Sequence, residues 1–187
     1  MNRHSEREHT IDAQDSIRHA IGTLDSAIAD PKQGLPEDVF LFISRITPMI
    51  NVDLLVKDEK NRVLLTWRQD RYHEPGWHVP GGIVRFKEKF EERIRKVALN
   101  ELGAVVSHDV DPVEMNQLII RDREERSHFI SLLFRCTLVT GLDAAREHIS
   151  GEPVNGFWRW HESCPNTLLA VQSMYRKYFH DAARYHE

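Results

Sequence analysis

The chain has 187 residues, of which 41% are hydrophobic, and a formal net charge of −4. This length and composition are typical of one globular domain that can bury a core. Because the charges are mixed, without a basic stripe or a run of like charges, we expect neither a nucleic-acid partner nor an anionic membrane, and a small-molecule ligand is favoured.

The first ten residues, MNRHSEREHT, lack the apolar stretch of a signal peptide, and no segment approaches the roughly 18 apolar residues of a membrane helix. We therefore expect a cytoplasmic protein. Its two cysteines, Cys136 and Cys164, are far apart and outside any metal or redox spacing, so both are predicted to be reduced thiols.

The N-terminal part is predicted to hold two helices. Residues 1–12 are polar and are expected to be irregular. An amphipathic helix is predicted over residues 15–29, and Pro31 follows it. Proline and two acidic residues then precede a short helix over residues 39–45. We place a domain boundary here, with an N-terminal extension over residues 1–35 and the main domain over residues 36–187.

Two hairpins are predicted in the main domain. The first joins apolar runs at 49–56 and 62–67 across a charged turn. Residues 69–76 are predicted to form a loop, and a sharp glycine turn then leads into a helix that ends at Gly103. The second hairpin joins residues 115–120 to residues 128–138.

The C-terminal part begins with an irregular loop over residues 140–156. A last strand is predicted over residues 156–160. Residues 165–183 carry an apolar stripe at helical spacing, which predicts a closing helix.

One acidic residue stands out on the helix that precedes Gly103. At 100° per residue, Glu101 lies on the same side as Phe90, Ile94 and Val97, which is the side expected to face the sheet. A buried carboxylate needs a proton, a basic side chain or a cation. Alternatively, the last turn of the helix emerges into solvent.

Two glycines favour the cation. Gly81 and Gly82 precede the helix and allow the backbone to approach a ligand closely. Carbonyl and carboxylate oxygens are the ligands that Mg²⁺ prefers, and its coordination is commonly completed by waters and substrate phosphates. We therefore predict that Glu101 holds Mg²⁺, with Mn²⁺ as an alternative, and that the metal holds a pyrophosphate.

These residues carry a resemblance. Gly82, five residues, Glu88, seven residues, Lys96 and then Glu101-Leu102-Gly103 resemble the Nudix box of hydrolases of nucleoside-diphosphate-linked substrates. Two acidic positions of that box hold Val97 and Asn100 instead.

The same departures are similar to the GDP-mannose mannosyl hydrolase branch. The likeness extends from about residue 38 to 180 and includes Asp53, Arg68, Trp77 and the pair Arg159-Trp160. It implies an α/β fold, a Nudix-type α/β/α sandwich with a mixed β-sheet, to which this chain adds an N-terminal helix.

The resemblance also implies roles for single residues. Gly81 and Glu101 would bind one Mg²⁺, and Arg68 would meet the diphosphate leaving group. Asp53 would lie near the sugar, and Lys96 would support the phosphates. Arg71, three residues after Arg68, suits phosphate as well, since two arginines here enter a glycine-rich turn. Alternatively, Asp53 forms a structural ion pair and the two arginines are surface charges.

The resemblance leaves the general base open. Counting back from Arg159-Trp160, Asn155 stands where that branch has a histidine, and an amide does not accept a proton at neutral pH. His148, Glu152 and His161 are the candidates to replace it, with His148 our choice for the base and Glu152 a further metal ligand. His148 is alternatively a solvated loop residue.

The sequence thus predicts a Mg²⁺-dependent hydrolase of a small-molecule nucleotide substrate, a nucleotide sugar in particular, that releases a nucleoside diphosphate and a sugar. One alternative is attack at phosphorus, which gives a nucleoside monophosphate and a phosphate product. Another is a catalytically silent nucleotide-sugar binding module. A homodimer is expected, partly because the resemblance implies it and partly because the helix at 15–29 needs an apolar surface to cover.

Overall fold

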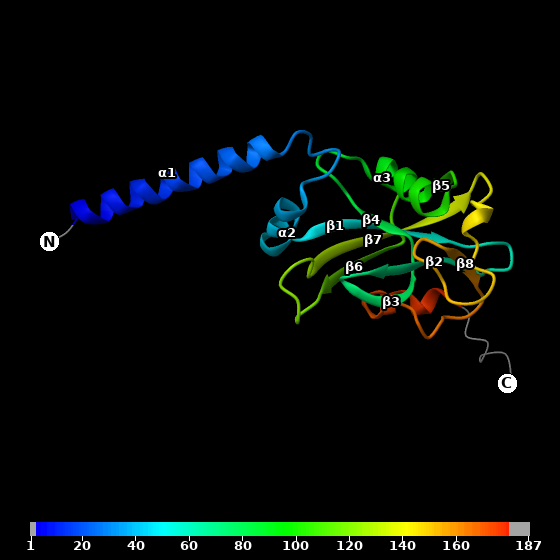
Figure 1. The fold of residues 1–187 in the computed structure, drawn as a ribbon. Helices are drawn as coiled ribbons and strands as arrows, with labels where there is room; N and C mark the ends of the chain where they lie inside the picture. The colour runs from blue at the N-terminus through cyan, green and yellow to red at the C-terminus, as the bar shows by residue number, and fades with distance from the viewer. Residues whose placement is uncertain (1–2, 180–187) are drawn as a thin grey trace.

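The computed structural model describes the backbone of residues 3–179 and the side chains of residues 13–179. Its strands form two sheets (Figure 1). The larger sheet has the order β4-β1-β7-β5, and β6 also pairs with β7. The smaller sheet has the order β3-β2-β8. Since β1 and β7 are parallel while every other pair is antiparallel, the larger sheet is mixed.

The bounds of the elements are as follows. The helices are α1 (Arg3–Ala27), α2 (Glu37–Ile46) and α3 (Phe90–Val97). The larger sheet contains β1 (Met49–Val56), β4 (Gly81–Ile83), β5 (Val106–His108), β6 (Glu114–Ile119) and β7 (His128–Leu138). The smaller sheet contains β2 (Val63–Asp70), β3 (His73–His78) and β8 (Trp158–His161). Short helical turns lie at Ala98–Leu102, Ala144–Arg146 and Ala170–Tyr178.

The apolar run of β1 is buried because both faces of its sheet are covered. Leu54 packs into a core with Ile94 and Leu102 from the helical segment 90–102. The neighbouring Leu55 points to the other face, into a second core that includes Trp77 and Tyr175. Alternate residues of one strand thus supply two cores, as the pleat requires. The predicted mixed α/β architecture is confirmed.

The helix that follows the glycine turn changes pitch before it ends. After Val97 it continues as one π-helical turn over Ala98–Leu102, and Gly103 closes it in a left-handed conformation with φ 64°. Its buried apolar residues are Ile94, Val97, Ala98 and Leu102, whereas Phe90 is 42% exposed. Wider turns of this kind often occur at functional sites, and this one carries Glu101.

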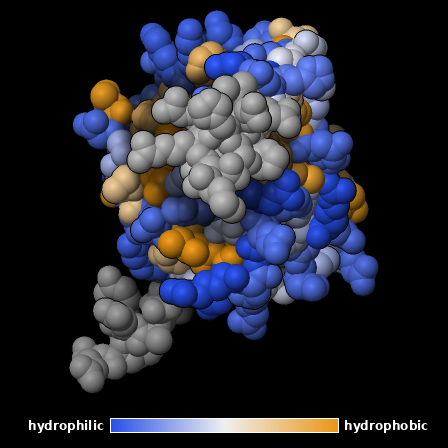
Figure 2. All heavy atoms as spheres, turned by 90° about the vertical axis from the view of Figure 1, so that its left-hand side faces the viewer, coloured by the Kyte–Doolittle hydropathy of each residue, from blue (hydrophilic) through white to orange (hydrophobic). Residues whose placement is uncertain are grey.

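The predicted N-terminal helix is present but begins earlier. Residues 3–12, expected to be irregular, are part of α1. This helix projects away from the sheets, in blue in Figure 1. The face from which it projects is mostly hydrophilic with scattered apolar patches (Figure 2), and Ile17 and Ile21 remain 59% and 52% exposed. The boundary at residue 35 stays a prediction.

Two other expectations were wrong. The loop expected over residues 69–76 is mostly strand, because residues 69–70 end β2 and residues 73–76 begin β3. Strand β3 is the outer strand of its sheet, and an outer strand tolerates Pro75. The closing helix over 165–183 is instead a 3₁₀ segment over Ala170–Tyr178, and its predicted end, 180–183, lies outside the described residues. No helix in the described part of the chain is long and apolar enough to cross a membrane.

Candidate active site

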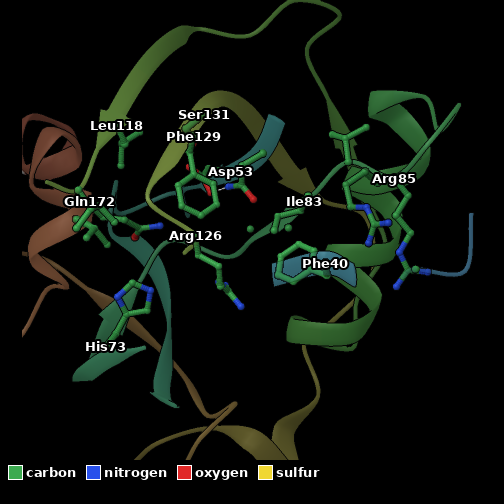
Figure 3. A pocket seen from close by; sticks show the side chains of 18 of the residues that line it. Phe40, Asp53, His73, Ile83, Arg85, Leu118, Arg126, Phe129, Ser131 and Gln172 are labelled. Carbon is green, nitrogen blue, oxygen red and sulfur yellow. Dashed lines mark hydrogen bonds between the residues drawn. The ribbon is translucent and has the colours of Figure 1, made fainter. Parts of the chain in front are cut away.

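A cavity of about 530 Å³ opens where the two sheets meet the N-terminal segment. Its lining combines positive charge with apolar surface. The basic side chains are Arg68, Arg85, Arg93, Arg126 and His73, and the apolar ones include Phe40, Ile83, Leu118, Ile120, Phe129 and Met174. Figure 3 shows Arg126 between His73 and Phe40, with Asp53 and Ser131 on another wall. Such a lining suits a ligand with an anionic part and an apolar or planar part.

Asp53 is the acidic residue of this lining, and β1 holds it in the sheet with only 2% of its surface exposed. Its carboxylate accepts hydrogen bonds from Asn51 Nδ2 at 2.6 Å, from Tyr175 Oη at 2.6 Å and from Ser131 Oγ. Burial raises the pKa of Asp53 to about 6, against these bonds, which lower it. Three donors occupy most of its roughly four acceptor positions, so Asp53 has room for one further hydrogen bond.

Glu101 lies beside this cavity. Its Oε2 accepts a hydrogen bond from Thr66 Oγ1 at 2.9 Å, and its Oε1 lies 3.3 Å from the amide nitrogen of Gly81. His78 Nε2 lies 2.9 Å from the same Thr66 hydroxyl and 3.7 Å from Glu101. Burial raises the pKa of Glu101 to about 7, although the bonds from Thr66 and Gly81 lower it. Burial also lowers the pKa of His78 to about 3, so His78 is neutral and does not compensate the carboxylate.

Arg68 links this carboxylate to the cavity. It lies two residues after Thr66 on β2, so both side chains leave the same face of the strand. Its Nε donates to Asp70 Oδ2 at 2.5 Å, and its charge lowers the pKa of both Asp53 and Glu101. The structure therefore brings Asp53, Arg68, Gly81 and Glu101 close together.

Lys96 and Arg71 lie elsewhere. Lys96 Nζ donates to Glu88 Oε1 at 2.8 Å, and Arg93 Nε donates to Glu88 Oε2 at 2.7 Å. Burial alone would raise the pKa of Glu88, but its bonds to Lys96, the Arg85 amide and Arg93 lower that pKa to about 2. The pair Glu88–Lys96 thus fixes the loop onto α3.

Arg71 points to α2 instead. It forms an ion pair with Glu37 and also donates to the hydroxyl of Tyr72. Its side chain is 60% exposed and does not line the cavity. The prediction that Arg71 contacts substrate therefore has no support from this geometry.

The structure places His148, our choice for the base, outside the cavity lining. Its ring lies 5.7 Å from that of Trp77, which also contacts His161 at 4.7 Å. Trp77 and His78 are neighbours on β3, so their side chains point to opposite faces. His148 and His161 therefore lie on the opposite face of β3 from Glu101. Burial, followed by the charge of Arg159, lowers the pKa of both histidines.

The loop over residues 140–156, which carries Glu152, does not contribute to the cavity lining. Glu152 is exposed and is not part of the cavity lining. Asn155, which replaces the expected histidine, accepts a hydrogen bond from the amide of Gln69 at 2.9 Å. Within the described residues, no group of three or more His, Cys, Asp or Glu side chains is arranged to hold a metal. Glu101 is therefore left as the candidate for a carboxylate ligand of the metal.

Sequence reasoning missed several cavity residues, among them His73 and Arg126. His73 lies at the start of the unpredicted strand β3, and burial together with Arg68 lowers its pKa to about 4, so it is neutral at pH 7. Arg126 belongs to the charged turn between β6 and β7, where nothing in the sequence separates it from Arg121 or Arg123. Only the fold brings these two side chains to the cavity.

Residues 47–163 match the NUDIX domain family, which is more than half of the chain. The chain belongs to the NUDIX domain family. The prediction of a Nudix-type hydrolase is thereby confirmed at the level of the family. Val97, where the box has a glutamate, is 4% exposed, and a β-carbon on Gly82 would lie 2.8 Å from its Cγ2. In this Nudix domain, an apolar packing contact stands where the box has a carboxylate.

Solved structures show the same fold. A structure described as a possible asymmetric diadenosine tetraphosphate hydrolase from Jonesia denitrificans is 18% identical, with a TM-score of 0.55, and the match covers 71% of this chain and 92% of that one. A MutT NUDIX hydrolase from Burkholderia pseudomallei is 18% identical, with a TM-score of 0.54 and coverage of 70% and 97%. At these identities the likeness concerns the fold alone.

One curated relative is more similar in sequence. The low-salt glycan biosynthesis protein Agl8 of Haloferax volcanii is 34% identical over 77 residues, which are 41% of this chain. The match spans about half of the length of that relative, 49%.

Proposed function

We propose that this Nudix domain is a Mg²⁺-dependent hydrolase of a nucleoside diphosphate derivative, and that its substrate is a nucleotide sugar, cleaved to a nucleoside diphosphate and a free sugar. The observation that carries the proposal is the cavity of about 530 Å³ that Arg68, Arg85 and Arg126 line, together with Gly81, whose amide contacts Glu101. Several guanidinium groups suit a diphosphate, since each presents a fork of donors to phosphate oxygens.

The residues present offer Mg²⁺ one carboxylate and one backbone carbonyl. Glu101 is a carboxylate whose pKa burial raises to about 7, and its neighbour His78 is neutral, so a cation would relieve the cost of its charge. Mg²⁺ is often held by one or two carboxylates, with waters and substrate phosphates completing its coordination. Glu101 would hold the metal, and the Gly81 carbonyl remains our proposed second ligand. When bound, Mg²⁺ would neutralise charge on the diphosphate.

The protein side chains would act on the leaving group. Arg68 lies on the same strand face as Thr66 and already contributes its positive charge to Glu101 and Asp53. Its guanidinium stabilises the negative charge that grows on the diphosphate as the bond to the sugar breaks. Asp53, with one acceptor position left, would accept a hydrogen bond from a sugar hydroxyl.

His73 is our candidate for the base. It lines the cavity and is neutral at pH 7, and Figure 3 shows its ring on the same side of the cavity as Arg126. A neutral imidazole takes a proton from an attacking water. A bound anionic substrate would offset the charge of Arg68 and so raise the pKa of His73 towards its ordinary value of 6.5, which would make it a stronger base in the complex.

Two comparisons support a sugar-linked substrate. The relative Agl8 is a glycan biosynthesis protein by name, which favours a substrate with a sugar. The resemblance to the GDP-mannose mannosyl hydrolase branch, with Val97 and Asn100 in place of two acids, favours the same class. Fewer acidic ligands hold fewer cations, and a single metal suits the departure of an intact diphosphate.

Product analysis in ¹⁸O-labelled water tests the proposal. The full chain is incubated with Mg²⁺ and a panel of nucleotide sugars, and the products are separated by anion exchange. We expect a nucleoside diphosphate and a sugar that carries the label. A labelled phosphate with a nucleoside monophosphate would show attack at phosphorus. Saturable binding without any product would indicate a silent binding module instead.

We also infer that the protein is a homodimer through α1. The apolar side chains Ile17 and Ile21 are more than half exposed on a helix that projects from the rest of the chain (Figure 1). Sedimentation of the full chain is expected to show a dimer, and Ile17→Lys with Ile21→Lys is expected to give a monomer. Asp15→Lys with His19→Lys, on the opposite side of the helix, is the control. A double Ile variant that remains dimeric would contradict this inference.

A further inference from the structure

The N-terminal segment forms part of the cavity wall although it lies outside the family match, which begins at residue 47. Phe40 of α2 lines the cavity, as do Gly34 and Leu35 of the linker before it. Arg85 Nη1 donates to the carbonyl of Lys32 at 3.2 Å. The segment is therefore attached to the glycine-rich loop, and it supplies a wall that the matched domain does not contain.

Arg126 is held in this wall by two aromatic rings. Its guanidinium carbon lies 5.5 Å from the centre of the Phe40 ring and 4.3 Å from that of Tyr72. Stacking of this kind covers the faces of a guanidinium and leaves its edge free to donate hydrogen bonds. The buried Nε of Arg126 has no hydrogen-bond partner within residues 13–179. Figure 3 shows the side chain extending between His73 and Phe40.

The backbone of Arg126 is also constrained by α2. Its φ is +51°, a conformation that is uncommon for residues other than glycine. Its amide donates to the hydroxyl of Ser44 at 3.0 Å, and Ser44 is 2% exposed. A strained conformation persists where the surroundings determine it. Helix α2 thus fixes both the backbone and the side chain of Arg126.

The charges around Arg126 leave the cavity positive. Arg68 lines the same cavity, and the positive charges of Arg68 and Arg126 repel each other. Asp70 is near both, but it already accepts from Arg68 Nε. Asp53 is occupied by three donors. Asp70 compensates Arg68 in part, and the second guanidinium group, that of Arg126, makes the cavity suited to an anion.

We propose that Arg126, positioned by Phe40 and Ser44 of α2, binds a phosphate group of the substrate together with Arg68, so that the N-terminal segment is a working part of the substrate site. The inference deepens the proposed function and rests on it for the identity of the anion as part of a nucleoside diphosphate.

Calorimetric titration of the full chain with inorganic pyrophosphate, without metal, tests this inference apart from turnover. Arg126→Gln is compared with Arg121→Gln, which removes the same charge from an exposed position of the same turn. Phe40→Leu is compared with Phe42→Leu, which alters an exposed ring of the same helix. Arg126→Lys keeps the charge and removes the stacked plane, and it serves as the second variant where Arg126→Gln does not fold.

We expect Arg126→Gln to weaken pyrophosphate binding at least about tenfold, a loss typical of a charge-assisted hydrogen bond. Arg126→Lys and Phe40→Leu should weaken it severalfold, and both controls should remain within about twofold of the unaltered chain. Unaltered affinity in Arg126→Gln or Arg126→Lys, or no binding by the unaltered chain, would overturn the inference. If the expected pattern appears in a chain that hydrolyses nothing, the phosphate site stands and the proposed hydrolase fails.

Discussion

Thr66 donates its hydroxyl to Glu101 at 2.9 Å, and the same oxygen lies 2.9 Å from His78 Nε2. The bond favours the ionised form of Glu101 and so opposes the rise in pKa that burial causes. A metal ligand is commonly oriented by such a neighbour, whose removal costs about 10- to 100-fold in metal affinity. Loss of the Thr66–Glu101 bond is therefore expected to weaken Mg²⁺ binding.

Thr66→Val should raise the pKa of Glu101 further, because the valine cannot donate. At pH 7 the Mg²⁺ concentration for half-maximal activity is expected to rise about tenfold, and the deficit should shrink at higher pH. Thr66→Ser restores the donor and should restore the Mg²⁺ requirement. Equal Mg²⁺ requirements in the unaltered chain and Thr66→Val would show that the hydroxyl has no part in the site.

Gly81→Ala tests the packing of the glycine turn. Gly81 pairs with Asp53 across β4 and β1, and a β-carbon at residue 81 would overlap Asp53 Oδ1. We expect urea unfolding to show a loss of about 2 kcal/mol or more, as overpacking a buried site does. Gly141→Ala is the control, since nothing lies within 4 Å of its added carbon. Equal stability of the two variants would be evidence against this close approach.

His73→Gln and His148→Gln separate the two candidates for the base. Only His73 lines the cavity, so His73→Gln should lower kcat about 100-fold, with little change in KM. His148 contacts Trp77 on the other face of β3, so its variant should keep kcat. Steady-state kinetics on the best nucleotide sugar provides the comparison. Loss of kcat in His148→Gln alone would return the role to the 140–156 loop.

His161→Phe is expected to stabilise the protein, and more so at acid pH. The Nε2 of His161 is buried without a hydrogen-bond partner among the described residues, and burial followed by Arg159 lowers the pKa to about 4. Between pH 4 and 6.5 the unfolded chain binds a proton here that the folded chain does not, so the unaltered protein loses stability as pH falls. Phenylalanine keeps the contact with Trp77.

Urea unfolding at pH 7.5 and pH 5 measures the effect. The gain from His161→Phe should be larger at pH 5 by on the order of 1 kcal/mol. A gain that is the same at both pH values, or larger at pH 7.5, would show that the pKa of His161 is not lowered in the folded protein.

The elements that periodicity defined well were predicted closely. The runs at 49–56 and 128–138 match β1 and β7, because strands buried on both faces are continuous apolar runs. Strand β3 was missed because Pro75 and Gly76 are typical of a loop, and only its pairing with β2 makes it a strand. Helix α1 extends to Arg3 although its first residues show no apolar stripe.

The residues of the candidate site also fall into two groups, those that the sequence predicted and those that it did not. Glu101 and Gly81 belong to a local motif, so their spacing predicted that they would meet. Arg71 could not be assigned from sequence, because only the fold brings Glu37 to it. Lys96 is held by Glu88 of the same motif, a pairing that the sequence analysis did not consider. His73 and Arg126 belong to no motif and reach the cavity through β3 and a turn, so tertiary structure alone identified them.

The most direct test of the account is the Mg²⁺-dependent turnover of a nucleotide sugar by the unaltered chain, by Glu101→Gln and by Glu91→Gln, a control in the first turn of α3. Glu101→Gln removes the charge while keeping the shape, and we expect it to lower kcat at least about 100-fold. Glu91→Gln should keep full activity. If Glu101→Gln turns over as fast as the control, the carboxylate beside the cavity does not serve the reaction and the account of this site is contradicted.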